Sequence, residues 1–170
     1  MRWFFDTEFS ERGHQYPVEL ISIGLVSEAG ESYYAVSNEF DADGCNDWVK
    51  QNVLPRLPEK RYWKRRSQIS KDIKRLISAS IKEDPAIEFW GYFSDYDWVV
   101  FCQLFGAMIE LPKGWPMFCH DLMQEMKRLG IPREHLLANP GAHDALVDAE
   151  WTKDAYHEVR QIECMSLLDP

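Results

Sequence analysis

Trp3-Phe4-Phe5-Asp6-Thr7-Glu8 is the stretch that decides the fold, because it has the pattern of a buried strand that ends in two acids. The aromatic run favours a strand, and residues two apart in a strand point to the same face of the sheet. Asp6 and Glu8 would therefore present two carboxylates side by side. Carboxylates this close repel each other unless a cation lies between them, and Mg²⁺ or Mn²⁺ suits hard oxygen ligands. The alternative is that the pair ends an edge strand in solvent.

Further along, apolar runs predict the other strands of an α/β fold. Residues 18–26 form a mostly buried strand, and a turn at residues 28–31 leads into a second arm at residues 32–36. An aromatic-rich strand is expected at residues 87–92 and a short strand at residues 117–119. The arrangement predicts a mixed sheet that begins with a hairpin.

Helical periodicity and capping residues predict five helices around this sheet. They are expected at residues 47–52, 67–80 and 98–105, from the cap Asp121 to residue 129, and from the cap Asp144 to about residue 159. Gly106 and Gly130 would end the third and fourth helices. With 170 residues, the chain is long enough for one domain and too short for two comfortable ones, so a single domain at 1–170 is expected.

Composition limits the classes of protein that the chain can represent. Hydrophobic residues make up 45% of the chain and aromatic residues 14%, which favours a globular fold. No apolar run approaches the roughly 20 residues of a membrane span, and an acid at position 6 interrupts any signal-peptide core. We therefore expect a cytoplasmic protein with no membrane partner. Its four scattered cysteines are expected to be free thiols.

The charge distribution argues against a protein that coats nucleic acid. The net charge is −9 and the pI is near 5.0, although acids gathered around metal ions would inflate the negative count. One dense basic stretch covers residues 60–66 and is followed by Lys71, Lys74 and Arg75. Its interleaved aromatic residues are typical of a nucleic-acid contact surface, and a solvated surface segment is an equal alternative.

Two further acids are candidates for the same site as Asp6 and Glu8. Asp97 follows the strand expected at residues 87–92, and sites in open α/β sheets gather where such strands end. A buried, unpaired charge there would cost on the order of several kcal/mol. Asp97 must therefore be bound, capped or exposed. Asp95 can serve equally well as an acid at a helix N-terminus, and the pattern alone barely separates the two.

His143 and Asp148 are the last candidate pair. Five residues place them about 140° apart on one regular helix, so they cannot share a helical face. With Asp144 as the N-cap, His143 belongs to the preceding loop and Asp148 to the second turn. The loop can then bring the imidazole over whatever Asp148 binds. The alternative for a histidine near a glycine is an ordinary exposed loop position.

Together these residues resemble a known enzyme family. Asp6-Thr7-Glu8-Phe9, Tyr96-Asp97 and His143-(four residues)-Asp148 are similar, in order, to the three exonuclease motifs of the DEDD superfamily, histidine branch. That group includes ribonuclease T, oligoribonuclease and the proofreading subunits of bacterial polymerases. The short chain looks most like the small bacterial and phage 3′→5′ exoribonucleases. One departure is Phe93, where many members carry Asn.

The resemblance implies a ribonuclease H-like fold and hydrolysis assisted by two Mg²⁺ ions, with Mn²⁺ as a substitute. Asp6 would bridge both ions, Glu8 and Asp148 would hold one, and Asp97 would contribute to the other. His143 would take a proton from the attacking water. The substrate would be the 3′ end of RNA, with single-stranded DNA as the alternative, and the product a nucleoside 5′-monophosphate.

Substrate contacts are expected from Thr7 and Phe9, and less firmly from stacking by Tyr16 and Trp63, with core packing as the alternative for each ring. Relatives of this kind often dimerise, so a homodimer is possible. Two other functions stay open. A ribonuclease H-type endonuclease shares the fold and lacks the His-x₄-Asp pairing, and a non-catalytic acidic interaction domain would bind no divalent ion.

Overall fold

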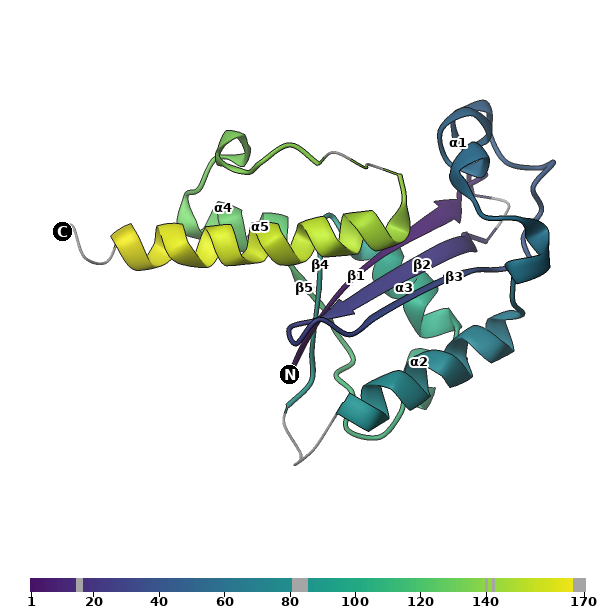
Figure 1. Cartoon of the computed structure of the whole chain (residues 1–170), viewed down its shortest axis with the longest axis horizontal. Helices are drawn as coiled ribbons and strands as arrows, with labels where there is room; N and C mark the ends of the chain where they lie inside the picture. Colours follow the sequence, from purple (N-terminus) through teal and green to yellow (C-terminus); the bar gives the residue numbers. More distant parts are fainter. Residues whose placement is uncertain (15–16, 81–85, 140, 142, 167–170) are drawn as a thin grey trace.

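A five-stranded mixed sheet lies at the centre of the computed structural model, which describes residues 1–14, 17–80, 86–139, 141 and 143–166 (Figure 1). The strands are β1 (Arg2–Ser10), β2 (Glu19–Ser27), β3 (Ser32–Val36), β4 (Glu88–Gly91) and β5 (His120–Asp121). Their order across the sheet is β3-β2-β1-β4-β5. β2 runs antiparallel to both of its neighbours, β1 and β3, whereas β1, β4 and β5 are parallel to one another.

Helices cover both faces of the sheet. The α-helices are α1 (Asp47–Asn52), α2 (Arg66–Ser80), α3 (Asp95–Gln103), α4 (Leu122–Leu129) and α5 (Ala145–Ser166). Short 3₁₀ turns occur at η1 (Leu54–Arg56), η2 (Lys60–Tyr62), η3 (Met108–Glu110) and η4 (Arg133–His135). Within the described residues, no helix is long and apolar enough to cross a membrane.

The alternation of side chains along β1 divides the core into two layers. Trp3 and Phe5 pack with residues of α2 and α3, whereas Phe4 packs with residues of α4 and α5. Figure 1 shows α5 running along one side of the sheet, with α2 and α3 on the other side. Because side chains alternate, Asp6 and Glu8 continue the α5 side of β1 and Thr7 continues the α3 side.

Most of the expected elements are confirmed, and with them the α/β fold with a mixed sheet flanked by helices. Asp121 caps α4 by accepting a hydrogen bond from the Gln124 amide, and Gly130 ends that helix at a φ of 70°. Asp144 accepts hydrogen bonds from the amides of Leu146 and Val147, as expected of the cap of α5.

The differences come from packing that local patterns do not show. The strand expected at residues 117–119 is wrong: β5 is His120–Asp121, because only these residues pair with Trp90 and Gly91 of β4. α3 begins at Asp95 rather than at residue 98 and ends at Gln103, and its Val99 side is open to solvent, with Val99 48% exposed. α5 continues to Ser166, since Ile162 still packs against the core beyond residue 159. β1 extends to Ser10, so the acids lie within the strand rather than at its end.

Candidate active site

Three carboxylates from two distant parts of the chain meet on the α5 side of β1. Asp6 and Glu8 come from the strand, and Asp148 comes from the first turn of α5. One oxygen from each of these three side chains lies within 4.8 Å of the other two. Such a set of hard oxygen donors is suited to a divalent cation. The structure therefore brings together three of the four acids for which metal binding was expected.

A glycine lets α5 approach the sheet this closely. Gly24 of β2 pairs directly with Asp6 of β1. A Cβ atom at Gly24 would lie 2.1 Å from the carbonyl oxygen of Ala145 and 2.4 Å from the Cα atom of Leu146. The start of α5 thus rests on the backbone of β2, where no side chain fits. This contact determines how close the carboxylate of Asp148 lies to that of Asp6.

Asp97 reaches β1 from the other side. It lies in the first turn of α3 and is 6% exposed, whereas Asp95 is exposed. One carboxylate oxygen of Asp97 accepts hydrogen bonds from the backbone amide of Thr7 at 2.9 Å and from its hydroxyl at 2.5 Å. Of the two acids that the sequence barely separated, Asp97 is the one that contacts the strand between Asp6 and Glu8.

The electrostatics of these acids favour the binding of a positive charge. Burial, and then the nearby carboxylate of Asp97, raise the pKa of Asp6 well above its ordinary value of 3.8. Burial and the carboxylate of Asp148 raise the pKa of Glu8 to about 8. Burial also raises the pKa of Asp97 to about 6, against the two hydrogen bonds from Thr7. At neutral pH the cluster carries its full negative charge only if a cation compensates it.

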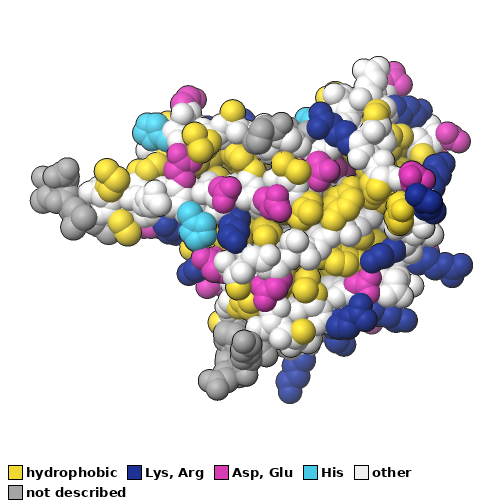
Figure 2. Space-filling view, viewed as in Figure 1, with side chains coloured by type: hydrophobic (Ala, Val, Ile, Leu, Met, Phe, Trp, Pro, Cys, Tyr) yellow, Lys and Arg dark blue, Asp and Glu magenta, His cyan; other side chains and the backbone are white. Residues whose placement is uncertain are grey.

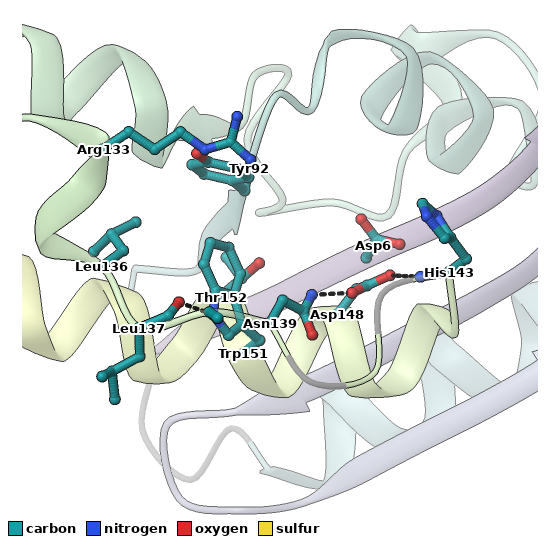
Figure 3. Close-up of a pocket in the computed structure, with 11 residues that line it drawn as sticks. Asp6, Tyr92, Arg133, Leu136, Leu137, Asn139, His143, Asp148, Trp151 and Thr152 are labelled. Atoms are coloured by element: carbon teal, nitrogen blue, oxygen red, sulfur yellow. Dashed lines mark hydrogen bonds between the residues drawn. The ribbon is translucent and has the colours of Figure 1, made fainter.

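His143 lies beside the acids on the loop that precedes α5, as the sequence predicts. Its backbone amide donates to one oxygen of Asp148 at 2.8 Å, and the side-chain amide of Asn139 donates to the other oxygen. Its imidazole contacts the Trp48 ring, with centroids 4.7 Å apart and planes at 87°. The backbone of His143 has a φ of 75°, which is rare for residues other than glycine. Figure 3 shows Asp6, Asp148 and His143 close together at one end of a pocket in the surface.

Two hollows meet at the acids, and both are lined by Asp6, His143 and Asp148. The first, here called the Phe9 hollow, has a volume of about 360 Å³ and is also lined by Thr7, Glu8, Phe9, Glu11, Asn46, Trp48, Val49, Phe93 and Asp97. The second, the Arg133 hollow, has a volume of about 330 Å³ and is also lined by Tyr92, Arg133, Leu136, Leu137, Ala138, Asn139, Trp151 and Thr152 (Figure 3).

Only some of the residues expected to contact the substrate line the two hollows. Thr7 and Phe9 line the Phe9 hollow, where the Phe9 ring also packs on Tyr96 with centroids 5.6 Å apart. Trp63 lines neither hollow; it stacks on Phe40 and donates to the carbonyl of Pro58. Tyr16 falls outside the described residues.

The basic segment at residues 60–66 lies beside the β3 edge of the sheet, where Lys64 forms a bridge with Ser37. No residue of this segment is among the described residues that line the two hollows. Lys64 pairs with Asp72, and the backbone amide of Arg66 donates to Glu39. Figure 2 shows Lys and Arg side chains gathered over α2 and the segment before it. These contacts favour the alternative of a solvated, partly paired surface.

Three residues at the site were not predicted from the sequence. Trp48, on the short helix α1, reaches the imidazole of His143 from outside the sheet, and its 51% exposure is unusual for tryptophan. Asn139 lies outside every helix and strand that the sequence predicts, and its side-chain amide donates to Asp148. Arg133 lies in a 3₁₀ turn with no motif around it. A tryptophan in the short helix expected at residues 47–52 was the one signal that the sequence contained.

Comparisons with known proteins agree with this geometry. A family model described as the 3′-5′ exoribonuclease Rv2179c-like domain matches residues 1–160. Two relatives from Mycobacterium tuberculosis strains, the 3′-5′ exoribonucleases Rv2179c and MT2234.1, are each 45% identical over 152 residues. Each alignment covers 88% of this chain and 87% of the relative.

Solved structures show the same fold. The nuclease domain of 3′hExo, a DEDDh family member bound to rAMP, has a TM-score of 0.56 at 15% identity, covering 95% of this chain and 91% of that chain. A 3′-exonuclease that recognises the histone mRNA stem-loop has a TM-score of 0.62 at 13% identity, and the match covers 95% of this chain and 63% of that one. The ribonuclease H-like fold that the three motifs implied is thus confirmed. On the match over residues 1–160 and the 45% identity, the chain belongs to the 3′-5′ exoribonuclease Rv2179c-like domain family.

Proposed function

We propose that this chain is a 3′→5′ exoribonuclease that releases nucleoside 5′-monophosphates from RNA with the help of two divalent cations. The observation that carries the proposal is the meeting of Asp6, Glu8 and Asp148, whose oxygens lie within 4.8 Å of one another. Family membership supports the same reaction.

The donor set fits divalent cations. All of its atoms are carboxylate oxygens, and the raised pKa values of Asp6 and Glu8 mean that the folded site disfavours their charge without a cation. Asp6, Glu8 and Asp148 would hold one ion, and Asp6 with Asp97 would hold the other; Mg²⁺ is our assignment and Mn²⁺ a substitute. Bound ions would lower the pKa of a water molecule and stabilise charge on the leaving 3′ oxygen.

The remaining residues position the site's side chains and transfer a proton. Thr7 fixes one oxygen of Asp97, so the other oxygen stays available to a ligand. Asp148 holds the backbone of His143, and Trp48 restricts its ring. We assign His143 as the general base, because an imidazole exchanges protons near neutral pH and this ring lines both hollows where they meet the acids.

Labelled oligonucleotides test this proposal. A 5′-labelled RNA should shorten progressively, and a 3′-labelled RNA should release a labelled mononucleotide at once, only with Mg²⁺ or Mn²⁺. Asp6→Asn and Glu8→Gln should abolish both products, whereas Glu150→Gln, an exposed acid of α5, should not. Hydrolysis that persists in Asp6→Asn with excess EDTA would contradict the two-cation proposal.

The same experiment separates the alternatives. A ribonuclease H-type endonuclease would give internal fragments from both labels. A non-catalytic acidic domain would give no product and no stabilisation by divalent ions. Digestion of single-stranded DNA in parallel measures how fast it is hydrolysed relative to RNA. We keep as further proposals a single exonuclease domain over 1–170, action in the cytoplasm and a homodimer.

A further inference from the structure

We propose that the RNA strand leaves the site through the Arg133 hollow, where Arg133 binds the phosphate one nucleotide upstream of the scissile bond. This inference rests on the proposed function, and it assigns a direction to the substrate.

The two hollows correspond to the two nucleosides of a phosphodiester. Both are lined by Asp6, Asp148 and His143, so the scissile phosphate belongs at the place where they meet. One nucleoside must then lie on each side of the acids. The remaining question is which hollow holds the 3′-terminal nucleoside.

Charge answers that question. A 3′-terminal nucleoside carries no phosphate beyond the scissile one, whereas the upstream nucleoside carries another phosphate on its 5′ side. Among the described residues that line the Phe9 hollow, none is Lys or Arg, and Glu11 adds a further acid. The Arg133 hollow contains a guanidinium. The terminal nucleoside therefore fits the Phe9 hollow, and the upstream nucleotide fits the Arg133 hollow.

Arg133 is available for a phosphate. Its guanidinium carbon lies 5.7 Å from the centre of the Tyr92 ring and 5.9 Å from that of Phe93, and within the described residues it forms no ion pair with a carboxylate. Figure 3 shows it lying against Tyr92 at the edge of the hollow. By contrast, Arg128 and Arg160 both form ion pairs with Glu125. A guanidinium supported by aromatic rings keeps its planar set of donors free for phosphate oxygens.

The hydroxyl of Tyr92 is a second, independent feature of this hollow. It is buried, and no hydrogen-bond partner for it occurs in the described part of the chain. Buried hydroxyls rarely lack a partner, so a ligand that enters the hollow can supply one. The ring of Trp151 lies against Tyr92 with centroids 5.0 Å apart, and its indole nitrogen is already used by the carbonyl of Leu137. The walls therefore offer apolar surface to a nucleoside and one free hydroxyl to its polar atoms.

Three substrates of increasing length isolate the contribution of Arg133. Uridine 5′-(p-nitrophenyl phosphate) ends at the scissile phosphate, UpU adds the upstream nucleoside, and pUpU adds the upstream phosphate. Arg133→Ala should lower kcat/KM for pUpU at least about tenfold more than for UpU, mainly through KM, because a charged hydrogen bond is lost in ground and transition states alike. Arg133→Lys should recover part of the loss. Lys127→Ala, which removes an exposed charge on α4, should change none of the three.

Tyr92→Phe provides the second test. It removes only the unpaired hydroxyl, so the melting temperature should stay at or above that of the wild type. KM should rise for UpU and pUpU relative to the p-nitrophenyl ester.

Several outcomes would contradict the assigned direction of the strand. If Arg133→Ala changes kcat/KM by the same factor for pUpU and UpU, or if Lys64→Ala with Arg65→Ala shows the larger pUpU-specific loss, the assigned direction is wrong. If the wild type hydrolyses labelled RNA but shows no preference of pUpU over UpU, this inference fails alone; if it hydrolyses neither these substrates nor labelled RNA, the proposed function fails and this inference fails with it.

Discussion

Thr7 donates two hydrogen bonds to a single carboxylate oxygen of Asp97, from its amide at 2.9 Å and from its hydroxyl at 2.5 Å. Thr7 lies between Asp6 and Glu8 on the strand, and its side chain points to the opposite face. One tripeptide thus supplies two acids on the α5 side and holds a third acid on the α3 side. The side chain of Thr7 is 4% exposed and engaged with Asp97, which favours a positioning role over direct contact with RNA.

Thr7→Val is expected to weaken this arrangement without removing it. The substitution keeps the shape and the amide hydrogen bond but loses the hydroxyl, so turnover should fall by about ten- to a hundredfold. The Mg²⁺ concentration for half-maximal activity should rise, and Thr7→Ser should restore it. Equal titrations for Thr7→Val and the wild type would show that the hydroxyl does not position Asp97.

Asp97→Asn and Asp95→Asn form a matched pair on α3. Asp97 is buried against Thr7, whereas Asp95 is exposed, so only the first substitution should abolish metal-dependent turnover. Both variants should be assayed across a range of Mg²⁺ concentrations. An inactive Asp95→Asn beside an active Asp97→Asn would reverse the assignment.

His143→Ala should lower kcat by roughly 10²–10⁴-fold, the usual contribution of a general base. The backbone amide that holds Asp148 survives the substitution, so stabilisation of the fold by Mg²⁺ should remain. Thermal unfolding with and without Mg²⁺ measures this directly. His135→Ala, at an exposed position of η4, is the control. Loss of the Mg²⁺-induced shift would instead make His143 a metal ligand.

Gly24→Ala is expected to impair the site although Gly24 has no side chain. Its Cβ atom would lie 2.1 Å from the carbonyl oxygen of Ala145, so α5 must move and carry Asp148 away from Asp6. Turnover and the Mg²⁺-induced stabilisation should both decrease. Gly30→Ala is the comparison: its φ of 97° strains an alanine, but nothing lies within 4 Å. It should reduce stability and leave kcat unchanged at saturating Mg²⁺.

Without metal, stability should decrease as the pH rises from 5 to 8.5. The pKa of Glu8 is about 8 in the folded chain against an ordinary value of 4.5. A raised folded pKa gives stability that is fully present below the unfolded value and is lost as the pH rises through the folded value. The raised pKa values of Asp6 and Asp97 also make the fold less stable as the pH rises. Melting temperatures in EDTA should show this slope, and Mg²⁺ or Glu8→Gln should flatten it. A melting temperature that rises with pH would contradict the assigned shifts.

Local rules were enough to predict the face of the sheet and the order of the acids. The period of two placed Asp6 and Glu8 together, and the cap at Asp144 correctly separated loop-borne His143 from helical Asp148. These inferences involve residues within a few positions of each other. They needed no knowledge of how the strands pack.

Contacts across the fold escaped prediction. The bond from Thr7 to Asp97 joins residues 90 positions apart, and the contact of Gly24 with Ala145 depends on how α5 rests on the sheet. Residues 117–119 have good strand propensity, yet β5 is His120–Asp121 because these residues reach the free edge of β4. Arg133 carries no motif, and only its position beside Tyr92 distinguishes it from other arginines.

The position of α5 also has a consequence during synthesis of the protein on the ribosome. Asp6 and Glu8 emerge early, but the partner strand β4 follows some eighty residues later, and Asp148 arrives only with the last helix. At about 5–20 residues per second, the growing chain exists for several seconds without the carboxylate of Asp148. A nascent chain interrupted anywhere before α5 therefore lacks a complete set of acids. On the proposed function, such an unfinished polypeptide would not cleave the messenger and ribosomal RNA beside it.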